Sequence, residues 1–90
     1  MRFRARVDNG QKEIVEYLRK AGFSVFHTHQ IGGGFPDLVI GKAGQTWLIE
    51  IKSEKGKLKQ NQVEFRDNWK GSPVQTFFSL QDAIEFSRGF

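Results

Sequence analysis

Cysteine is absent from this sequence of 90 residues. Disulfide frameworks and thiolate metal sites are therefore excluded. The absence suits a reducing compartment, and we expect a cytoplasmic protein. Long hydrophobic runs are absent too, since no apolar stretch approaches the roughly 20 residues that a membrane-spanning helix needs. The sequence therefore predicts a protein with no membrane segment.

Signals for secretion and for repeats are also missing. The first eight residues, MRFRARVD, are basic but lack the apolar stretch of a signal peptide. Internal repeats, low-complexity tracts and interdomain linkers do not occur in the sequence. Ninety residues leave no room for a second core, so we expect residues 1–90 to form a single domain, with residues 1–7 as a basic N-terminal arm.

Positive charge exceeds negative charge. Fourteen Lys and Arg residues stand against ten Asp and Glu residues, which gives a net charge of +4. The cations gather near the start and in the middle of the chain, at Arg2, Arg4 and Arg6 and at Lys52, Lys55, Lys57 and Lys59. Such clusters suit a phosphate-bearing partner, and a merely solvated basic surface is an equally good interpretation.

Hydrophobic spacing and turn residues divide the chain into three helices and four strands. In the first helix, Ile14, Val15 and Leu18 form an apolar stripe at helical spacing, and Gly22 is suited to end it. Ser79 is suited to cap the last helix. The expected helices span residues 8–22, 58–71 and 79–87, and the expected strands span residues 23–29, 36–40, 46–52 and 74–78.

The order of these elements, α-β-β-β-α-β-α, limits how they can be arranged. Short turns join the first three strands, so they should form an antiparallel meander. A helix bridges the third and fourth strands, which predicts a parallel pair with a right-handed crossover. We expect an α/β (α+β) fold with a small mixed sheet, the first helix covering one face and the second helix the other.

Two acids and a lysine lie where the two middle strands should meet. Asp37 stands near the start of strand 36–40, and Glu50 stands near the end of strand 46–52. In an antiparallel pair these two ends are neighbours, so the two carboxylates can converge. Lys52 follows Glu50 by two residues and therefore shares its strand face.

Such a pair of carboxylates suits a divalent metal ion. Two carboxylates held close together repel each other, and a bound cation removes that penalty. Oxygen ligands with few protein contacts suit Mg²⁺ or Mn²⁺, and a lysine beside the ion can orient water or stabilise charge on a phosphate. Taken singly, an Asp after Pro is often a turn residue, and a Glu-x-Lys at a strand end is usually a solvated edge.

These motifs resemble the signature of a nuclease superfamily. Pro-Asp at residues 36–37 and Glu-Ile-Lys at residues 50–52 are similar to the PD-(D/E)XK pattern. The segment GFPDL at residues 34–38, the lysine-bearing loop and Gln62 in the second helix resemble the VRR-NUC (virus-type replication-repair nuclease) branch, in its stand-alone viral or bacterial form. The resemblance covers most of the chain and implies a restriction-endonuclease-like αβββαβ core.

The resemblance also implies a role for each matching residue. Asp37 and Glu50 would bind catalytic Mg²⁺ or Mn²⁺ together with the backbone carbonyl of Ile51. Lys52 would position or activate the attacking water, and Gln62 would hydrogen-bond near that lysine or a phosphate. Substrates in the family are DNA phosphodiesters, and stand-alone viral members are associated with homodimers and four-way junction cleavage. The expected setting is therefore a bacterial or phage-infected cell.

One position departs from the family pattern. Related nucleases often carry a Glu on the first helix that approaches the metal, and Gln11 stands at the corresponding position. Asp8 lies one turn earlier on the same helix face, whereas Glu13 points away from that face. We therefore assign the metal-binding role to Asp8 first and to Gln11 second, with Gln11 also a candidate DNA contact. An N-cap is an equally good interpretation of Asp8.

The basic loop and the glycine-rich loop supply further candidate DNA contacts. Lys55, Lys57 and Lys59 can track phosphates, a non-specific contribution that weakens with salt. Gly33 and Gly34 either let the backbone approach DNA closely or only allow the chain to turn.

Two classes of function fit this sequence. The first is a metal-dependent endodeoxyribonuclease that prefers branched DNA such as four-way junctions, with flaps or plain duplex as alternative substrates. The second is a DNA-binding module that keeps the fold without catalysis. The presence of Asp37, Glu50 and Lys52 together favours the enzyme, since a non-catalytic domain has no need for that combination.

The phenylalanine content predicts a homodimer. Five of the nine phenylalanines are too many for one small core, and they are Phe35, Phe77, Phe78, Phe86 and Phe90. Some of them should therefore lie in an interface. A two-fold dimer would also place two active sites on one molecule, as symmetric junction cleavage requires.

Overall fold

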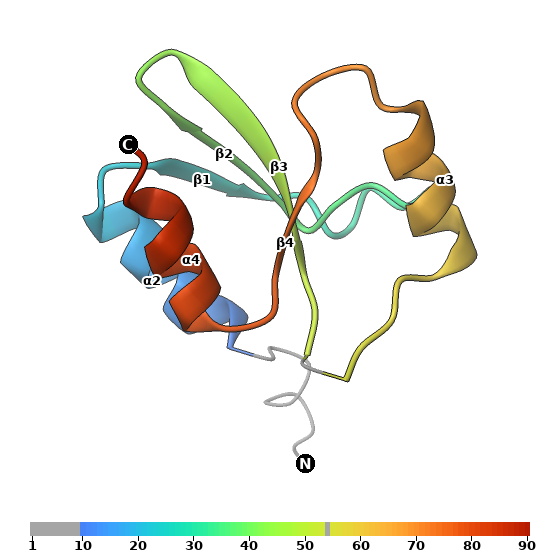
Figure 1. The fold of residues 1–90 in the computed structure, drawn as a ribbon, viewed down its shortest axis with the longest axis horizontal. Helices are drawn as coiled ribbons and strands as arrows, with labels where there is room; N and C mark the ends of the chain where they lie inside the picture. The colour runs from blue at the N-terminus through green and yellow to red at the C-terminus, as the bar shows by residue number, and fades with distance from the viewer. Residues whose placement is uncertain (1–9, 54) are drawn as a thin grey trace.

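The computed structural model describes residues 10–53 and 55–90 (Figure 1). The expected arm at residues 1–7 and the expected cap residues Asp8 and Asn9 lie outside the described residues. The helices and strands are α2 (Gln11–Lys20), β1 (Ser24–His27), β2 (Leu38–Lys42), β3 (Gln45–Ile51), α3 (Gln60–Asn68), β4 (Gln75–Phe77) and α4 (Leu80–Ser87). Within these described parts, no helix has the length and apolar character needed to cross a membrane.

The four strands form one mixed sheet in the order β1-β2-β3-β4. Strand β2 pairs antiparallel with both β1 and β3. Strand β4, which follows α3 in the chain, pairs parallel with β3. The predicted element order and the predicted pairing are therefore confirmed. The register places Leu38 opposite Ile49, which brings the start of β2 to the end of β3.

Helices α2 and α4 pack together against one face of this sheet (Figure 1). Helix α2 buries Ile14, Val15 and Leu18, and α4 buries Ala83, in a shared core with the inward side chains of the strands. The core also contains Phe23, Val25, Leu38, Ile40, Trp47, Ile49, Ile51 and Phe77. The first helix thus covers one face as predicted, with the last helix beside it.

The position of the second helix agrees with the prediction, but its mode of contact with the sheet was not predicted. Helix α3 lies on the side away from α2 and α4, but none of its residues is buried (Figure 1). It meets the sheet mainly through polar side chains, Gln62 and Arg66. The physical reason is that this face of the sheet carries the charged Glu50, which an apolar helix face could not satisfy.

Helix α3 is also shorter than the predicted span of residues 58–71. Lys59 and Trp69 flank it with extended backbone, so neither continues the helix. At the start, the Gln62 side chain accepts a hydrogen bond from the Lys59 backbone N–H at 2.8 Å. At the end, the Trp69 indole N–H donates to the Ser72 carbonyl at 3.0 Å. Helix α4, by contrast, starts at the predicted cap, since the Ser79 hydroxyl accepts from the Asp82 backbone N–H.

Candidate active site

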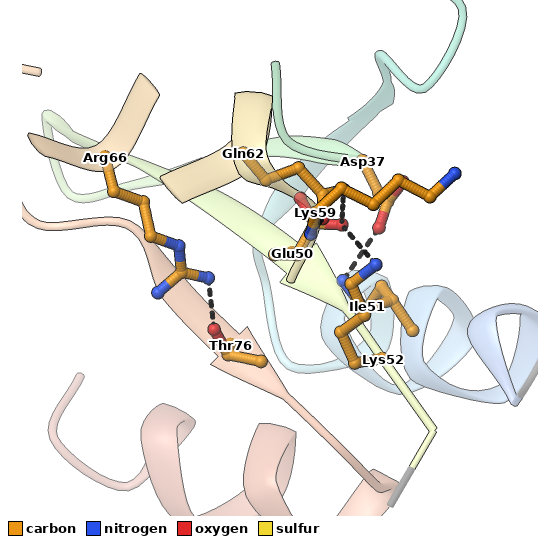
Figure 2. Close-up of polar contacts among 8 residues, drawn as sticks. All are labelled: Asp37, Glu50, Ile51, Lys52, Lys59, Gln62, Arg66 and Thr76. Atoms are coloured by element: carbon orange, nitrogen blue, oxygen red, sulfur yellow. Dashed lines mark hydrogen bonds and ion pairs between the residues drawn. The ribbon is translucent and has the colours of Figure 1, made fainter. Parts of the chain in front are cut away.

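Asp37 is fixed against β3 by two hydrogen bonds. Its backbone N–H donates to the Ile49 carbonyl at 3.0 Å, and its Oδ2 accepts from the Ile51 N–H at 2.8 Å (Figure 2). The antiparallel register pairs the next residue, Leu38, with Ile49, so Asp37 enters the sheet beside the end of β3. The carboxylate therefore has a defined position beside β3.

Glu50 is the one buried charged residue of the described chain, with 3% of its surface exposed. It stands on the β3 face opposite to Ile49 and Ile51, whose side chains enter the hydrophobic core. Its Oε2 accepts a hydrogen bond from Gln62 Nε2 at 3.0 Å, and the same oxygen lies 3.8 Å from Lys52 Nζ (Figure 2). The predicted convergence of Asp37, Glu50 and Lys52 is therefore present in the structure.

The electrostatic setting of Glu50 is unfavourable for a second negative charge. Burial and the neighbouring Asp37 carboxylate raise the pKa of Glu50 from its ordinary value of 4.5 to about 7. The positive charges of Lys52 and Arg66 act in the opposite direction. The carboxyl group therefore stays half protonated near neutral pH until another cation arrives.

This donor set fits a hard divalent cation. Asp37 and Glu50 present carboxylate oxygens, and their mutual repulsion is the kind that a bound cation relieves. Within residues 10–53 and 55–90 no group of three or more His, Asp or Glu side chains meets. A site with two carboxylates suits Mg²⁺ or Mn²⁺, which retain several waters and take phosphate oxygens, better than a metal that needs an all-protein cage.

Lys52 lies just beyond the end of β3, and 17% of its side chain is exposed. Its backbone N–H donates to the Phe77 carbonyl at 3.1 Å, which extends the parallel pairing with β4 past the strand end. The ammonium group is thereby held beside Glu50 while remaining partly open to solvent.

Gln62 connects α3 to the carboxylate pair. Its Oε1 accepts from the Lys59 N–H while its Nε2 donates to Glu50, so the two bonds together fix the orientation of the amide. Gln62 therefore orients a candidate metal ligand, and it bonds the same Glu50 oxygen that lies beside Lys52. A contact of Gln62 with a phosphate stays a prediction.

Arg66 was missed by the sequence analysis. It follows Gln62 by one helical turn, and its guanidinium donates to the Thr76 hydroxyl of β4 (Figure 2). Thr76 is the register partner of Glu50 in the parallel pair, which explains why the Arg66 charge acts on Glu50. The available signal was the spacing of four residues between Gln62 and Arg66, which places both on one helix face.

The remaining predicted residues were candidates for an added metal ligand or for DNA contacts. Asp8, the first choice for an added metal ligand, lies outside the described residues. Gln11 hydrogen-bonds the ring of His27 through its amide nitrogen at 3.1 Å, and Glu13 is exposed on α2. The DNA-binding roles of Gln11 and of the three exposed lysines Lys55, Lys57 and Lys59 stay predictions.

Gly34 is required for packing against α3. Its φ is +83°, and a Cβ at this position would lie 2.2 Å from the Asn61 carbonyl oxygen. The glycine therefore lets the first turn of α3 approach the loop that leads to Asp37. Gly33 faces open space, and the DNA contacts of Gly33 and Gly34 stay predictions.

Comparison with known proteins adds to this geometry. Residues 3–78 match the VRR-NUC domain family. The chain belongs to the VRR-NUC domain family. A solved chain described as a VRR_NUC domain superposes with a TM-score of 0.75, at 24% identity, over 89% of this chain and 91% of that one. A search of curated proteins found no match.

Membership of the VRR-NUC family assigns this chain a nuclease-type fold. The Pro-Asp and Glu-Ile-Lys motifs that carry the resemblance in the sequence are the segments that the sheet brings together. The structural match covers 89% of this chain, so the VRR-NUC fold is confirmed along with the predicted αβββαβ order.

Proposed function

We propose that this VRR-NUC domain is an endodeoxyribonuclease that hydrolyses DNA phosphodiesters with Mg²⁺ or Mn²⁺. The observation that supports the proposal is the meeting of Asp37, Glu50 and Lys52 where β2 begins and β3 ends. Glu50 is buried there, and its pKa is raised to about 7. A fold without catalysis gains nothing from a buried, repelling carboxylate pair.

Asp37, Glu50 and the Ile51 carbonyl would hold the metal ion. When bound, the ion would polarise the scissile phosphate and lower the pKa of a water ligand. Lys52 would stabilise the negative charge that develops on the phosphate, or orient the attacking water. Gln62 would keep the Glu50 carboxylate aimed at the ion through its 3.0 Å hydrogen bond.

We further propose that the protein acts as a homodimer on branched DNA such as four-way junctions. Of the five phenylalanines expected to exceed the core, Phe77 is buried and Phe86 packs against the core. Phe78 and Phe90 remain 43% and 45% exposed, so they are the members of that set available for an interface.

The test is cleavage of labelled four-way junction, flap, linear duplex and single-stranded DNA in Mg²⁺, in Mn²⁺ and in chelator. We expect cleavage only with a divalent ion. Asp37→Asn and Glu50→Gln should each abolish cleavage while circular dichroism shows an intact fold, because either change relieves the carboxylate repulsion. Full activity of Asp37→Asn would refute the metal site.

The alternative, a DNA-binding module of the same fold, gives a different result in this assay. Such a protein would bind the labelled DNA in chelator and in metal alike and would release no product. The exposed Glu16→Gln on α2 is the matched control, since it removes one carboxylate charge outside the site.

A further inference from the structure

A second aromatic cluster lies outside the hydrophobic core. Phe35 stacks on Phe65 with ring centroids 5.3 Å apart, and Phe65 meets Trp69 edge to face at 5.3 Å. These rings belong to the glycine-rich loop, to α3 and to the residue that ends α3. Figure 1 shows this loop and α3 side by side, apart from α2 and α4.

Trp69 is held in place although 40% of its surface is exposed. Its indole N–H donates to the Ser72 carbonyl, and its ring packs edge to face with Phe65. A large, exposed aromatic ring with a fixed orientation has already lost its rotational freedom, so a flat ligand can stack on it at low entropic cost.

The rings border an open hollow of about 220 Å³. The rings of Phe65 and Trp69 line it together with Gly33 and Asn68. The hollow is smaller than the roughly 300–1,000 Å³ of pockets for drug-sized ligands, so it suits one flat group. The Asn68 amide nitrogen donates to the Glu64 carbonyl, which leaves the amide oxygen as the group that can accept from a ligand.

The hollow is close to the carboxylate site because α3 contributes to both. Gln62 near the start of α3 bonds Glu50, while Asn68 at its end borders the hollow, about 9 Å further along the helix axis. Residues 57–70 carry four cations against two acids, which favours a polyanion along this segment. A nucleotide near the scissile phosphate can therefore reach the hollow.

We propose that Phe65, Asn68 and Trp69 form a stacking site for one unpaired nucleobase of the DNA substrate. Bases stack on exposed aromatic side chains largely without regard to sequence, and the Asn68 amide can add one hydrogen bond to the base edge. A stable contact with a second copy of the chain needs roughly 20–30 residues on each partner, and the hollow is lined by four. The proposal rests on the proposed action on DNA and names the feature of the substrate that is recognised.

This site would favour DNA that already offers an unpaired base. Intact duplex keeps its bases stacked and paired, whereas junction centres, flaps and single strands release them at little cost. A base held by α3 would place the adjoining phosphate toward the carboxylate pair.

Tryptophan fluorescence in chelator tests the stacking site without any cleavage. Trp47 is only 6% exposed and lies in the core, so an added base can quench mainly Trp69. The probes are oligothymidine and an abasic oligonucleotide of equal length, which has the same phosphates. We expect oligothymidine to quench the fluorescence and to bind more tightly, and the abasic probe to do neither.

Variants separate stacking from general charge. Trp69→Ala should weaken oligothymidine binding by about 5- to 150-fold and leave abasic binding unchanged, and Trp69→Phe should restore most of the loss. Phe26→Ala is the control, because Phe26 is an aromatic residue of β1 with 74% exposure. It should bind both probes like the unaltered protein.

Three results would overturn the stacking site. The first is equal quenching by both probes, and the second is an equal loss of affinity for both probes in Trp69→Ala. The third is a change of oligomeric mass in Trp69→Ala, which would make the stacking site a contact between copies. A protein that shows base-dependent quenching but never cuts DNA would refute only the proposed nuclease activity. A protein that cuts DNA without base-dependent quenching would refute only the stacking site.

Discussion

Asp37 and Glu50 form a pair that costs the metal-free fold stability and suits a metal ion. Glu50 is almost fully buried beside a second carboxylate, and this raises its pKa to about 7. The positive charges of Lys52 and Arg66 lower the pKa of Glu50 but do not restore it to its ordinary value. A buried acid with such a raised pKa is a candidate functional site, and the proposed metal ion would supply the missing positive charge.

The raised pKa of Glu50 predicts how stability depends on pH in chelator. Because the folded state holds the proton more tightly than the unfolded chain, the stabilising effect is fully present below about pH 4.5 and is lost as the pH rises through about 7. Glu50→Gln cannot lose a proton, so at pH 8 its melting temperature should exceed that of the unaltered protein, by on the order of 5 °C. Thermal melts from pH 5 to pH 8 measure this difference.

Two controls accompany these melts. Glu16→Gln removes an exposed carboxylate of α2 and should follow the unaltered protein at every pH. Mg²⁺ or Mn²⁺ at pH 8 should raise the melting temperature of the unaltered protein and leave that of Glu50→Gln unchanged. A Glu50→Gln protein that melts lower at pH 8 than the unaltered protein would contradict the assigned repulsion.

Lys52 should matter more for turnover than for binding. It is one lysine among many for phosphate attraction, but its ammonium lies 3.8 Å from the Glu50 carboxylate. Lys52→Ala should lower the single-turnover rate by at least about 100-fold and DNA affinity by less than about 10-fold. Lys20→Ala, which removes an exposed lysine at the end of α2, should show little change in rate. A parallel fall of rate and affinity in Lys52→Ala would mean that Lys52 only anchors DNA.

The sequence was sufficient to find Asp37, Glu50 and Lys52 because strand alternation and strand order place them. It was not sufficient to find Arg66 or the contact of Gln62 with Glu50. Both depend on how far α3 stands from the sheet, and no periodicity within α3 encodes that distance. Local spacing therefore predicts which side chains share a face, while tertiary packing decides what they touch.

At the scale of elements, α3 differs most from its prediction. The apolar residues Leu58 and Trp69 suggested a longer helix with one packed face. In the structure both lie outside α3, and the helix holds its place through Gln62, Arg66 and the close approach of Gly34. A helix positioned by few polar contacts is sensitive to a change at any one of them.

Gly34→Ala tests this sensitivity. The new methyl group would collide with the Asn61 carbonyl, so the first turn of α3 must move and the Gln62 bond to Glu50 must lengthen or break. We expect a loss of on the order of 2 kcal/mol in the free energy of unfolding, and a fall in cleavage rate beyond what the lost stability explains. Chemical denaturation and single-turnover cleavage measure the two effects.

Gly32→Ala is the matched control for that experiment. Gly32 has a φ of +82°, nearly the same as Gly34, but no atom lies within 4 Å of the position of its Cβ. Both variants therefore pay the same backbone strain, and only Gly34→Ala meets α3. Equal losses in the two variants would show that strain alone acts and that α3 does not depend on the glycine.

At the scale of the molecule, the fold was more predictable than its surface. The three helices and four strands of residues 10–53 and 55–90 follow from turn residues and hydrophobic periods, and the parallel pairing follows from the helical crossover. Which phenylalanines stay exposed depends on how α4 closes over the sheet. Phe86 joins the core through Trp47 and Phe23, whereas Phe78 faces outward just after β4.

The proposed homodimer is tested at this same scale. Symmetric cutting of a four-way junction needs two active sites, and a two-fold dimer provides them in a single assembly. We expect light scattering at micromolar concentration to give a dimer mass, and junction DNA to compete at least about 10-fold better than linear duplex. Phe78→Glu places a charge on an exposed apolar side chain, so it should give a folded monomer with weaker junction preference. If the unaltered protein is monomeric and cuts both substrates equally, the junction-resolving function is eliminated while the metal-dependent nuclease remains.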